Sequence, residues 1–492
     1  MRLYNTLSGT EEEFIPSGER VKMYVCGITP YASSHVGHAL SAVVFDVLRR
    51  YLEFQGYKLQ HVQNFTDVDD KIIARAAKQG VTYRELADRY IQEYTSDMDL
   101  LNVKRAHAYP LATDAIPRMV EVIADLIDKG YAYPSNGNVY FRVTMDDDYG
   151  KLSHRSLDSM IAGARVEVVE GKEHPMDFTL WKAAKPGEPA WESPWGPGRP
   201  GWHIECSTIA LDHLGESLDI HGGGLDLVFP HHENEIAQSE SYTGRIPFAR
   251  FWVHNGLLNL GEDKMSKSLG NLVGVSEALE HHSSDALRLY FLSSHYRSPL
   301  NYSAEGLAAM ERAAERLRNA LRQDSTTGND ALDPSHYEKQ FVTAMDADLN
   351  TPQAIAALFD LAHEINRARE RGQKVGQAQN SLRKLGDVLG LTFRERTSQE
   401  ALSLEPLAEL FKDIGATLNA SGHHKLAGWV NSHSDAQDAA TIVETLLAIR
   451  RELRQVREYD FADTIRSRLA DLGVGLEDAQ DGTVWKHRQS VV

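Results

Sequence analysis

The sequence predicts an α/β protein built on a Rossmann-type, doubly wound parallel sheet, with helical domains after it. Residues 20–27 (RVKMYVCG) form an apolar, β-rich run that ends on a glycine, which is typical of a buried parallel strand. Residues 33–54 carry apolar side chains at helical spacing, and a second strand-like run lies within residues 59–70. A strand, a crossover helix and a strand in this order indicate an open parallel sheet, whose ligands bind at the carboxyl ends of the strands. Cys26 and His35 both lie at such an end.

The first helix is predicted from its repeating apolar residues, with Ser33 or Ser34 available as the N-cap. Its apolar positions are Ala39, Val43, Val44, Val47, Leu48 and Leu52. Further along, the periodic pattern weakens, and residues 185–201 are rich in proline, glycine and tryptophan, which indicates an insertion between two halves of the fold. Short apolar runs that end on turn residues return at 217–230 and 251–260, and they predict the second half of the sheet.

Beyond residue 300 the pattern becomes helical. Thr351 is expected to cap a helix that starts at Pro352. The apolar face of that helix consists of Ile355, Leu358, Phe359, Ala362 and Ile365, and a later helix repeats the pattern with Ile442, Leu446, Ile449, Leu453 and Val456. A polar stretch at 393–403 separates two helical units. The predicted segments are the first half of the sheet domain at 1–110, an insertion at 111–200, the second half at 201–300, a helical bundle at 301–400 and a C-terminal domain at 401–492.

Composition places the chain among ordinary globular proteins. With 492 residues, of which 42% are hydrophobic and 25% charged, it is long enough for roughly three domains. No apolar run approaches the roughly 20 residues that span a bilayer, and the start MRLYNTLSGTEEEF lacks the basic and apolar regions of a signal peptide, so we expect a cytoplasmic protein without membrane contacts. The formal net charge of -18 argues against non-specific nucleic-acid binding but leaves room for a local basic face.

The two cysteines, Cys26 and Cys206, are too few for a disulfide framework. In a reducing compartment, metal binding or catalysis is the more frequent special use of such residues. The alternative is a pair of small, buried hydrophobic side chains.

The stretch LVFPHHENEIAQ at 227–238 favours a metal site. His231 and Glu235 are four apart on a helix that Pro230 can begin, so they lie on one face. Together with both cysteines they make a Cys₂HisGlu set suited to tetrahedral zinc. His232 with Glu235 is a poorer alternative pair, and ordinary surface polarity of the helix also stays open.

Two further motifs suit phosphate binding. HVGH at 35–38 places two histidines at the start of a helix, where imidazoles can donate to phosphate oxygens; a simple helix cap is the alternative. In GEDKMSKSLGN at 261–271, Lys264 and Lys267 lie in a glycine-flanked loop that can neutralise charge on a leaving group, the alternative being a solvated basic loop. The order strand, HVGH, HGGG at 221–224 and KMSKS favours the phosphate interpretation.

HVGH and KMSKS together resemble the two signature motifs of the class I aminoacyl-tRNA synthetases, and further stretches are similar to the cysteinyl-tRNA synthetase family. These stretches are MYVCGITPY, NFTDVDDKI, MDFTLWK, PWGPGRPGWHIECS, DIHGGGLDLVFPHHENEIAQ and KMSKSLGN, and the resemblance runs over nearly the full length. It implies one Zn²⁺ per chain, held by Cys26, Cys206, His231 and Glu235. It also implies a monomer that binds ATP with Mg²⁺, L-cysteine and tRNA(Cys).

The reaction implied by the resemblance has two steps. The cysteine carboxylate attacks the α-phosphate of ATP to give cysteinyl-adenylate and pyrophosphate, and the terminal adenosine hydroxyl of the tRNA then takes the cysteine. His35 and His38 would stabilise the transition state at the α-phosphate, while Lys267, helped by Lys264, would hold the departing phosphates. Zinc would distinguish cysteine from serine, because a metal readily deprotonates a thiol, whereas an alkyl hydroxyl is a poorer ligand.

The resemblance also assigns substrate-binding residues. Gly27, Thr66 and Trp202 would line the cysteine pocket, although Trp202 could equally be core and Thr66 a helix cap. The ATP-binding residues would be His35, His38, Gly222, Gly223, Asp226 and Lys267, the glycines because they permit close backbone approach. Residues 201–300 would then carry the KMSKS loop and a region that contacts the tRNA stem, and residues 401–492 would bind the anticodon.

Two other functions compete with this one. The cysteine ligase of mycothiol synthesis shares the adenylation domain and zinc site but joins cysteine to an amino sugar, and GITPYASSHVGHA leans towards it. The C-terminal part argues against it, because EYDFADTIRSRLADLGVGLEDAQDGTVWKHR resembles the anticodon-binding end of the synthetases. Candidate RNA contacts there are Arg450, Arg451, Arg454 and Arg457 on one helix, and Trp485, Lys486, His487 and Arg488. Residues 418–440 look inserted or remodelled. An inactive paralogue that binds nucleotide or RNA is disfavoured by the intact motifs.

Overall fold

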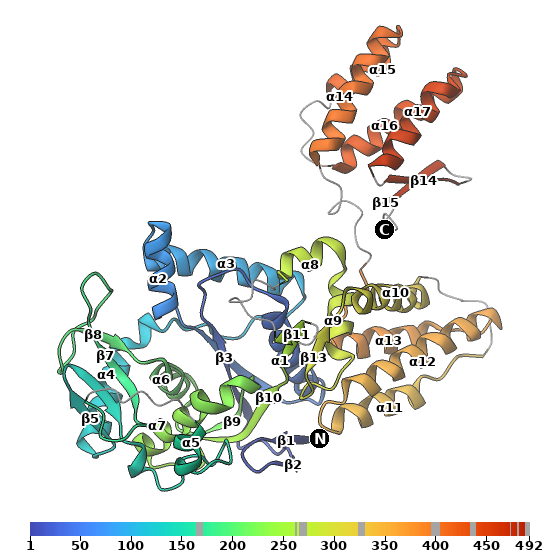
Figure 1. The fold of residues 1–492 in the computed structure, drawn as a ribbon. Helices are drawn as coiled ribbons and strands as arrows, with labels where there is room; N and C mark the ends of the chain where they lie inside the picture. Colours follow the sequence, from blue (N-terminus) through green and yellow to red (C-terminus); the bar gives the residue numbers. More distant parts are fainter. Residues whose placement is uncertain are drawn as a thin grey trace. The chain divides into compact units, whose positions relative to one another are not determined.

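The structure is a computed structural model, and it describes residues 1–163, 171–260, 263–264, 273–322, 330–394, 404–432, 439–472, 474–479 and 482–487. The chain divides into two compact units, residues 1–393 and residues 394–492 (Figure 1). Within the described ranges, no helix combines the length and the apolar character that crossing a bilayer requires.

The centre of the first unit is a four-stranded parallel sheet in the order β10-β9-β3-β4. Its strands are β3 (Arg20–Ile28), β4 (Lys58–Phe65), β9 (Leu218–Gly224) and β10 (Ala249–Asn255). Because β4 lies on one side of β3 and β9 on the other, the direction of winding reverses between β3 and β9. Ligands of such sheets bind in the crevice at this switch point. The predicted parallel sheet is confirmed, and its switch point is where Cys26 lies, near the end of β3.

Helix α1 (Val36–Phe54) crosses from β3 to β4 with its apolar residues buried. Its N-cap is His35, whose Nδ1 accepts a hydrogen bond from the amide of Gly37 at 3.2 Å, so the predicted serine cap is wrong. The hydroxyl of Ser34 instead donates to Asp97, on helix α3 (Tyr83–Leu100). The short helix α2 (Asp70–Gln79) precedes α3 and starts from the cap Asp69.

A second, antiparallel sheet, in the order β5-β6-β7-β8, is inserted in the sequence between β4 and β9. Its elements are α4 (Ile116–Asp128), β5 (Ala132–Ser135), β6 (Asn138–Phe141), α5 (Leu157–Gly163), β7 (Phe178–Ala183) and β8 (Gly198–Pro200). It has its own apolar core, which includes Val139, Leu180 and Trp181. Figure 1 shows this sheet on one side of the parallel sheet and the helical bundle of the same unit on the other.

The rest of the first unit contains helices and short strands. They are β1 (Arg2–Asn5), β2 (Thr10–Glu13), α6 (Trp202–Leu214), α7 (Glu233–Thr243), β11 (Leu258–Leu260), β12 (Asp263–Lys264), α8 (Val275–His281), α9 (Ser284–Leu292), β13 (Leu300–Tyr302), α10 (Ala304–Leu321), α11 (Ser335–Asp346), α12 (Thr351–Glu370) and α13 (Gly376–Val388). Asn350 caps α12 by accepting from the amide of Gln353 at 3.2 Å, so the predicted cap is wrong. Thr351 donates instead to the carbonyl of Leu292 at 2.8 Å.

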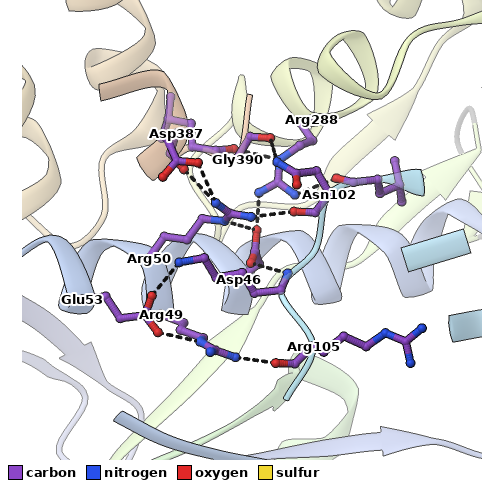
Figure 2. A network of polar contacts seen from close by, with 12 residues as sticks. Asp46, Arg49, Arg50, Glu53, Asn102, Arg105, Arg288, Asp387 and Gly390 are labelled. Carbon is purple, nitrogen blue, oxygen red and sulfur yellow. Dashed lines mark hydrogen bonds and ion pairs between the residues drawn. The ribbon is translucent and has the colours of Figure 1, made fainter. Parts of the chain in front are cut away.

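A buried ionic network ties α1 to the end of the bundle (Figure 2). Arg288 is fully buried and donates to Asp46 at 2.5 Å and to the carbonyls of Leu101 and Leu389 at 2.9 and 2.8 Å. Arg50 also donates to Asp46, at 2.8 Å. Although burial opposes ionisation, Arg288 and Arg50 together lower the pKa of Asp46. The network therefore joins α1, α9, the end of α3 and the end of α13.

Gly390 closes this network. Its φ is +70°, and a Cβ there would lie 2.1 Å from the guanidinium of Arg288, so a side chain is excluded both by backbone conformation and by space. Beyond it, the buried carboxylate of Asp285 accepts from the amides of Thr392 and Phe393 at 2.7 and 2.8 Å. The last residues of the first unit are thus hydrogen-bonded to α9 of the same unit.

The second unit is helical with a terminal hairpin. It comprises α14 (Leu404–Ala420), α15 (His424–Ser432), α16 (Ala439–Gln455), α17 (Tyr459–Asp471), β14 (Val474–Ala479) and β15 (Gly482–His487). Residues 418–440, which look inserted in the sequence, contribute α15, and its Leu426, Ala427 and Val430 join the core of this unit.

The predicted arginine cluster of the second unit is only partly present. Arg450 is 2% exposed and faces the core, and Arg457 follows the end of α16 with a φ of 65°. Arg451 and Arg454 remain exposed on α16. The side chains of Trp485, Lys486 and His487, and all of Arg488, lie outside the described residues.

Candidate functional site

Four potential metal ligands meet at the switch point of the parallel sheet. Cys26 comes from β3, Cys206 from α6, His231 from the turn at Val228–His232, and Glu235 from the first turn of α7. Their ligand atoms all lie within 4.8 Å of one another. The Sγ atom of Cys26 is 3.6 Å from that of Cys206 and 3.4 Å from Oε1 of Glu235, and Nε2 of His231 is 2.9 Å from the same oxygen.

A second set of potential ligands overlaps the first. Cys26, His221, His232 and Glu235 also have their ligand atoms within 4.8 Å of one another. Nε2 of His232 lies 3.2 Å from Sγ of Cys26, and Nε2 of His221 lies 2.8 Å from Oε2 of Glu235. The two sets share Cys26 and Glu235. In the first set, His221 contacts the outer oxygen of Glu235 and so fixes the orientation of the carboxylate.

The electrostatics of the cluster favour a bound cation. A hydrogen bond from Cys26 lowers the pKa of the Cys206 thiol to about 6. Burial opposes ionisation of Glu235, but His221 and His231 lower its pKa to about 2. Burial also opposes protonation of His231, yet Glu235 and Cys206 raise its pKa to about 10. Burial raises the pKa of Cys26 well above its ordinary value, so Cys206 and Glu235 are the anionic donors of the cluster. A metal ion would displace the protons of Cys26 and His231.

Each of the three residues predicted for the cysteine pocket lies next to a member of this cluster or to its sequence neighbour. Gly27 follows Cys26, and a Cβ there would lie 1.5 Å from the carbonyl oxygen of Asn64, which excludes any side chain. Thr66 is buried and donates to Oε2 of Glu205 at 2.8 Å. Trp202 is 41% exposed and stacks on His231, with ring centroids 4.4 Å apart. An exposed indole beside a buried cluster suits a pocket wall better than a core position.

The histidines of HVGH stack on each other at the start of α1, with ring centroids 3.7 Å apart. Nδ1 of His35 accepts from the amide of Gly37 at 3.2 Å, and Nδ1 of His38 accepts from the amide of His35 at 3.4 Å. In the neutral tautomer that these bonds select, the proton of each ring lies on Nε2, as a donor to an anion requires.

The glycines of HGGG have packing reasons for lacking side chains. A Cβ at Gly222 would lie 2.2 Å from the ring of Phe45 on α1, and one at Gly223 would lie 2.8 Å from the ring of His232. Asp226 lies in a short helical turn, Leu225–Leu227, directly after β9. Their predicted contact with ATP stays a prediction.

Of the loop that contains KMSKS, the structure describes the backbone of residues 263 and 264. Asp263 and Lys264 form β12, which pairs with β11 of a small sheet in the order β12-β11-β13. Lys267 lies outside the described residues, as do the side chains of Asp263 and Lys264.

Sequence reasoning missed the histidines around the ligands. His203 lies 3.0 Å from His231, measured between their Nδ1 atoms, and His254 lies 2.8 Å from His232. His221 is the first residue of HGGG, a stretch whose glycines alone suggested a function. His254 is next to last in β10, whereas His221 lies in the middle of the neighbouring strand β9, opposite Trp252. A search for polar residues at strand ends therefore finds His254 but not His221.

Comparisons with known proteins identify the family. The model of the class I (C) tRNA synthetase catalytic domain matches residues 14–312, and that of the DALR domain matches residues 340–394. A cysteine–tRNA ligase from Dehalococcoides mccartyi is 50% identical over 489 residues, which cover 99% of each chain. One from Aquifex aeolicus is 44% identical over 505 residues, again with 99% of each chain covered. The chain belongs to the class I cysteinyl-tRNA synthetase family.

Solved structures place this cysteinyl-tRNA synthetase family member in the class I fold. The Mycobacterium tuberculosis methionyl-tRNA synthetase in complex with methionyl-adenylate has a TM-score of 0.55 at 17% identity, over 76% of this chain and 90% of that one. A ternary complex of LeuRS, tRNA and LeuAMS from Agrobacterium radiobacter has a TM-score of 0.53 at 13% identity, over 77% of this chain and 84% of that one. These likenesses confirm the predicted fold.

Proposed function

We propose that the protein is a cysteine–tRNA ligase, which activates L-cysteine with ATP and transfers it to the 3′ end of tRNA(Cys), releasing AMP. The observation that carries this proposal is the full-length match to cysteine–tRNA ligases at 44% to 50% identity. That match covers 99% of the chain and so includes the second unit, which a ligase acting on an amino sugar does not need. Transfer to an amino sugar is therefore disfavoured.

The metal of the site is Zn²⁺, one per chain, held by Cys26, Cys206, His231 and Glu235. This set fits zinc because two thiols, one imidazole and one carboxylate are zinc's usual ligands, and their atoms already lie within 4.8 Å of one another. The overlapping set offers only one thiol, and thiolates select zinc over harder metals. When bound, zinc would act as a Lewis acid that favours a thiolate over an alkyl hydroxyl, and it would so discriminate against serine.

The chain's own residues position the cysteine beside this centre. Trp202 forms one wall, Gly27 lets the backbone of Asn64 pack against the end of β3, and Thr66 is held by Glu205 next to Cys206. Burial raises the pKa of Glu205 well above its ordinary value, and Glu205 accepts a hydrogen bond from Thr66.

In the activation step, a carboxylate oxygen of cysteine attacks the α-phosphate of ATP and pyrophosphate leaves. His35 and His38 donate from Nε2 to the oxygens of the α-phosphate, where negative charge develops, and the N-terminus of α1 adds its backbone dipole. Lys264 and Lys267 hold the departing phosphates, with Mg²⁺. The remaining ATP contacts are assigned to Gly222, Gly223 and Asp226.

In the transfer step, the terminal adenosine hydroxyl of tRNA(Cys) attacks the activated carbonyl and AMP leaves. Residues 201–300 contact the tRNA stem and residues 401–492 bind the anticodon, where Arg451 and Arg454 on α16 are exposed to reach phosphates. The enzyme acts as a monomer in the cytoplasm.

The test is to incubate the full chain with ATP, total tRNA and labelled cysteine or serine. Cysteine bound to RNA through an ester that mild base cleaves supports the proposal, and labelled serine should not be attached. Cysteine-dependent pyrophosphate exchange without tRNA charging, with cognate tRNA confirmed present, would instead favour another acceptor for the activated cysteine.

A further inference from the structure

Asp97 lies at the meeting point of two chain segments that flank the signature motifs. It sits on α3 and is 3% exposed. Its Oδ2 accepts from the hydroxyl of Ser34, and its Oδ1 accepts from the hydroxyl of Ser276 at 2.8 Å. Ser34 immediately precedes HVGH, and Ser276 lies in the first turn of α8, four residues after the undescribed stretch 265–272.

The same two segments are joined by their backbones. The amide of Val36 donates to the carbonyl of Val273 at 3.0 Å, and the amide of Val275 donates to the carbonyl of Ser34 at 3.2 Å. His35 and Gly274 form an antiparallel bridge between these bonds. Residues 34–36 at the start of the HVGH helix and residues 273–275 are therefore paired by backbone hydrogen bonds, as in a short two-stranded sheet.

The carboxylate completes this contact in a way that apolar packing would not. A carboxylate only accepts, so both serines must act as donors, and both hydroxyls are aimed at one side chain. Burying an acid is costly unless it is hydrogen-bonded, whereas α3 already packs through the buried apolar side chains of Tyr94 and Met98. The carboxylate of Asp97 therefore fixes the relative position of the two segments, whereas the apolar side chains supply the packing energy.

We propose that Asp97 is a positioning residue for adenylate formation, which holds the start of HVGH and the segment after KMSKS in fixed relation through Ser34 and Ser276. The inference rests on the proposed roles of the two motifs at the phosphates of ATP. Histidines on one segment and lysines preceding the other must address the same triphosphate, and errors of about 1 Å in such placement cost up to ~100-fold in rate.

The experiment measures cysteine-dependent ATP–pyrophosphate exchange with the full-length chain and its variants. Asp97→Ala should lower kcat/KM for ATP by about 10- to 100-fold and leave KM for cysteine within about twofold. Asp97→Asn should recover part of the loss, because the amide oxygen can still accept from one serine and its NH₂ can donate to the other.

Two further comparisons separate positioning from stability. Ser34→Ala and Ser276→Ala each remove one hydrogen bond to Asp97, and they serve as milder variants if Asp97→Ala folds poorly. The double variant should lose no more kcat/KM for ATP than Asp97→Ala, because both serines act through one carboxylate. Asp285→Ala removes another buried carboxylate, which anchors Thr392 far along the chain. It should lower the melting temperature and leave KM for ATP unchanged.

The inference is overturned if Ser276→Ala and Asp97→Asn leave kcat/KM for ATP at the wild-type value, or if KM values for ATP and cysteine rise equally. A wild-type chain that shows no cysteine-dependent exchange would overturn the proposed function and this inference with it. A wild-type chain that exchanges while all variants remain normal overturns the positioning role alone.

Discussion

The indole of Trp202 stacks on the imidazole of His231, with 4.4 Å between ring centroids and 28° between ring planes. Trp202 is 41% exposed, although large aromatic side chains are usually covered in a folded protein. The exposed indole of Trp202 therefore contacts a buried histidine, and under the proposed function a substrate side chain would approach the cluster from this side.

Replacing Trp202 should weaken cysteine binding with little effect on folding. Trp202→Ala is expected to raise KM for cysteine about tenfold, or ~1.4 kcal/mol, because one wall of the pocket is lost. The melting temperature should hardly change, since the side chain is partly exposed. Trp202→Phe keeps a ring and should lie between the two. An unchanged KM in pyrophosphate exchange would place the cysteine elsewhere.

The two overlapping ligand sets predict opposite outcomes for adjacent histidines. If zinc is held by the first set, His231→Ala should lose bound zinc and His232→Ala should keep it. Zinc content measured by elemental analysis of the purified variants decides between them. His213→Ala is the matched control, because His213 is an exposed histidine at the end of α6. Loss of zinc in His232→Ala alone would assign the second set.

Removing Arg288 should destabilise the first unit strongly. Arg288→Met leaves the buried carboxylate of Asp46 with only one of its two arginines, and breaking such a buried pair costs roughly 3–5 kcal/mol. The measurement is urea unfolding of the full chain followed by tryptophan fluorescence. Asp387→Asn is the control: the Asp387 side chain is 70% exposed, so losing its contact with Arg50 should cost at most about 1 kcal/mol. Equal effects would contradict the importance of the buried pair.

The same pair predicts a dependence of stability on pH. Arg288 and Arg50 hold the pKa of Asp46 in the folded state below the value of about 3.9 expected when unfolded. The stability that this shift contributes is fully present above that unfolded value and is lost as pH falls through the folded one. The difference in unfolding midpoint between wild type and Asp46→Asn should therefore be largest near neutral pH and shrink below about pH 4. A constant difference down to pH 3 would show that ionisation is irrelevant.

The first unit should activate cysteine by itself. A chain that ends at Phe393 retains the anchoring of Thr392 and Phe393 by Asp285, together with the apolar core of the unit. It is expected to keep cysteine-dependent pyrophosphate exchange within about threefold of the full chain and to lose at least ~100-fold in charging of tRNA(Cys), because the region assigned to the anticodon is missing. Full charging by the shortened chain would remove that assignment.

Much of the fold was predictable from local patterns, because the strands at 20–27 and 59–65 are apolar runs with clear ends. Helix caps were not: Ser34 and Thr351 have the right chemistry for caps, but Asp97 and the carbonyl of Leu292 compete for their hydroxyls, and both partners lie far away in the sequence. Tertiary hydrogen bonds of this kind leave no mark on local spacing.

The candidate site shows the same limit. His231 and Glu235 were predictable as a pair because they lie on one helical face, whereas the place of His221 and His254 depends on which strands become neighbours. Gly222 was expected to give ATP access to the backbone, and the structure shows the ring of Phe45 against it. A glycine in a sequence indicates that another group packs closely against its backbone, but the sequence alone does not tell whether that group is a ligand or a side chain of the same protein.

The separation of Cys26 and Glu235 by 209 residues has a consequence for the biosynthesis of the chain. At roughly 5–20 residues per second, the ribosome needs about 10–40 s to make the carboxylate after the first thiol. For most of that interval β3 lacks the neighbour β9, which follows the inserted antiparallel sheet. The nascent protein therefore has an unpaired strand edge and a Cys26 thiol without its later neighbours until the chain up to α7 has been made.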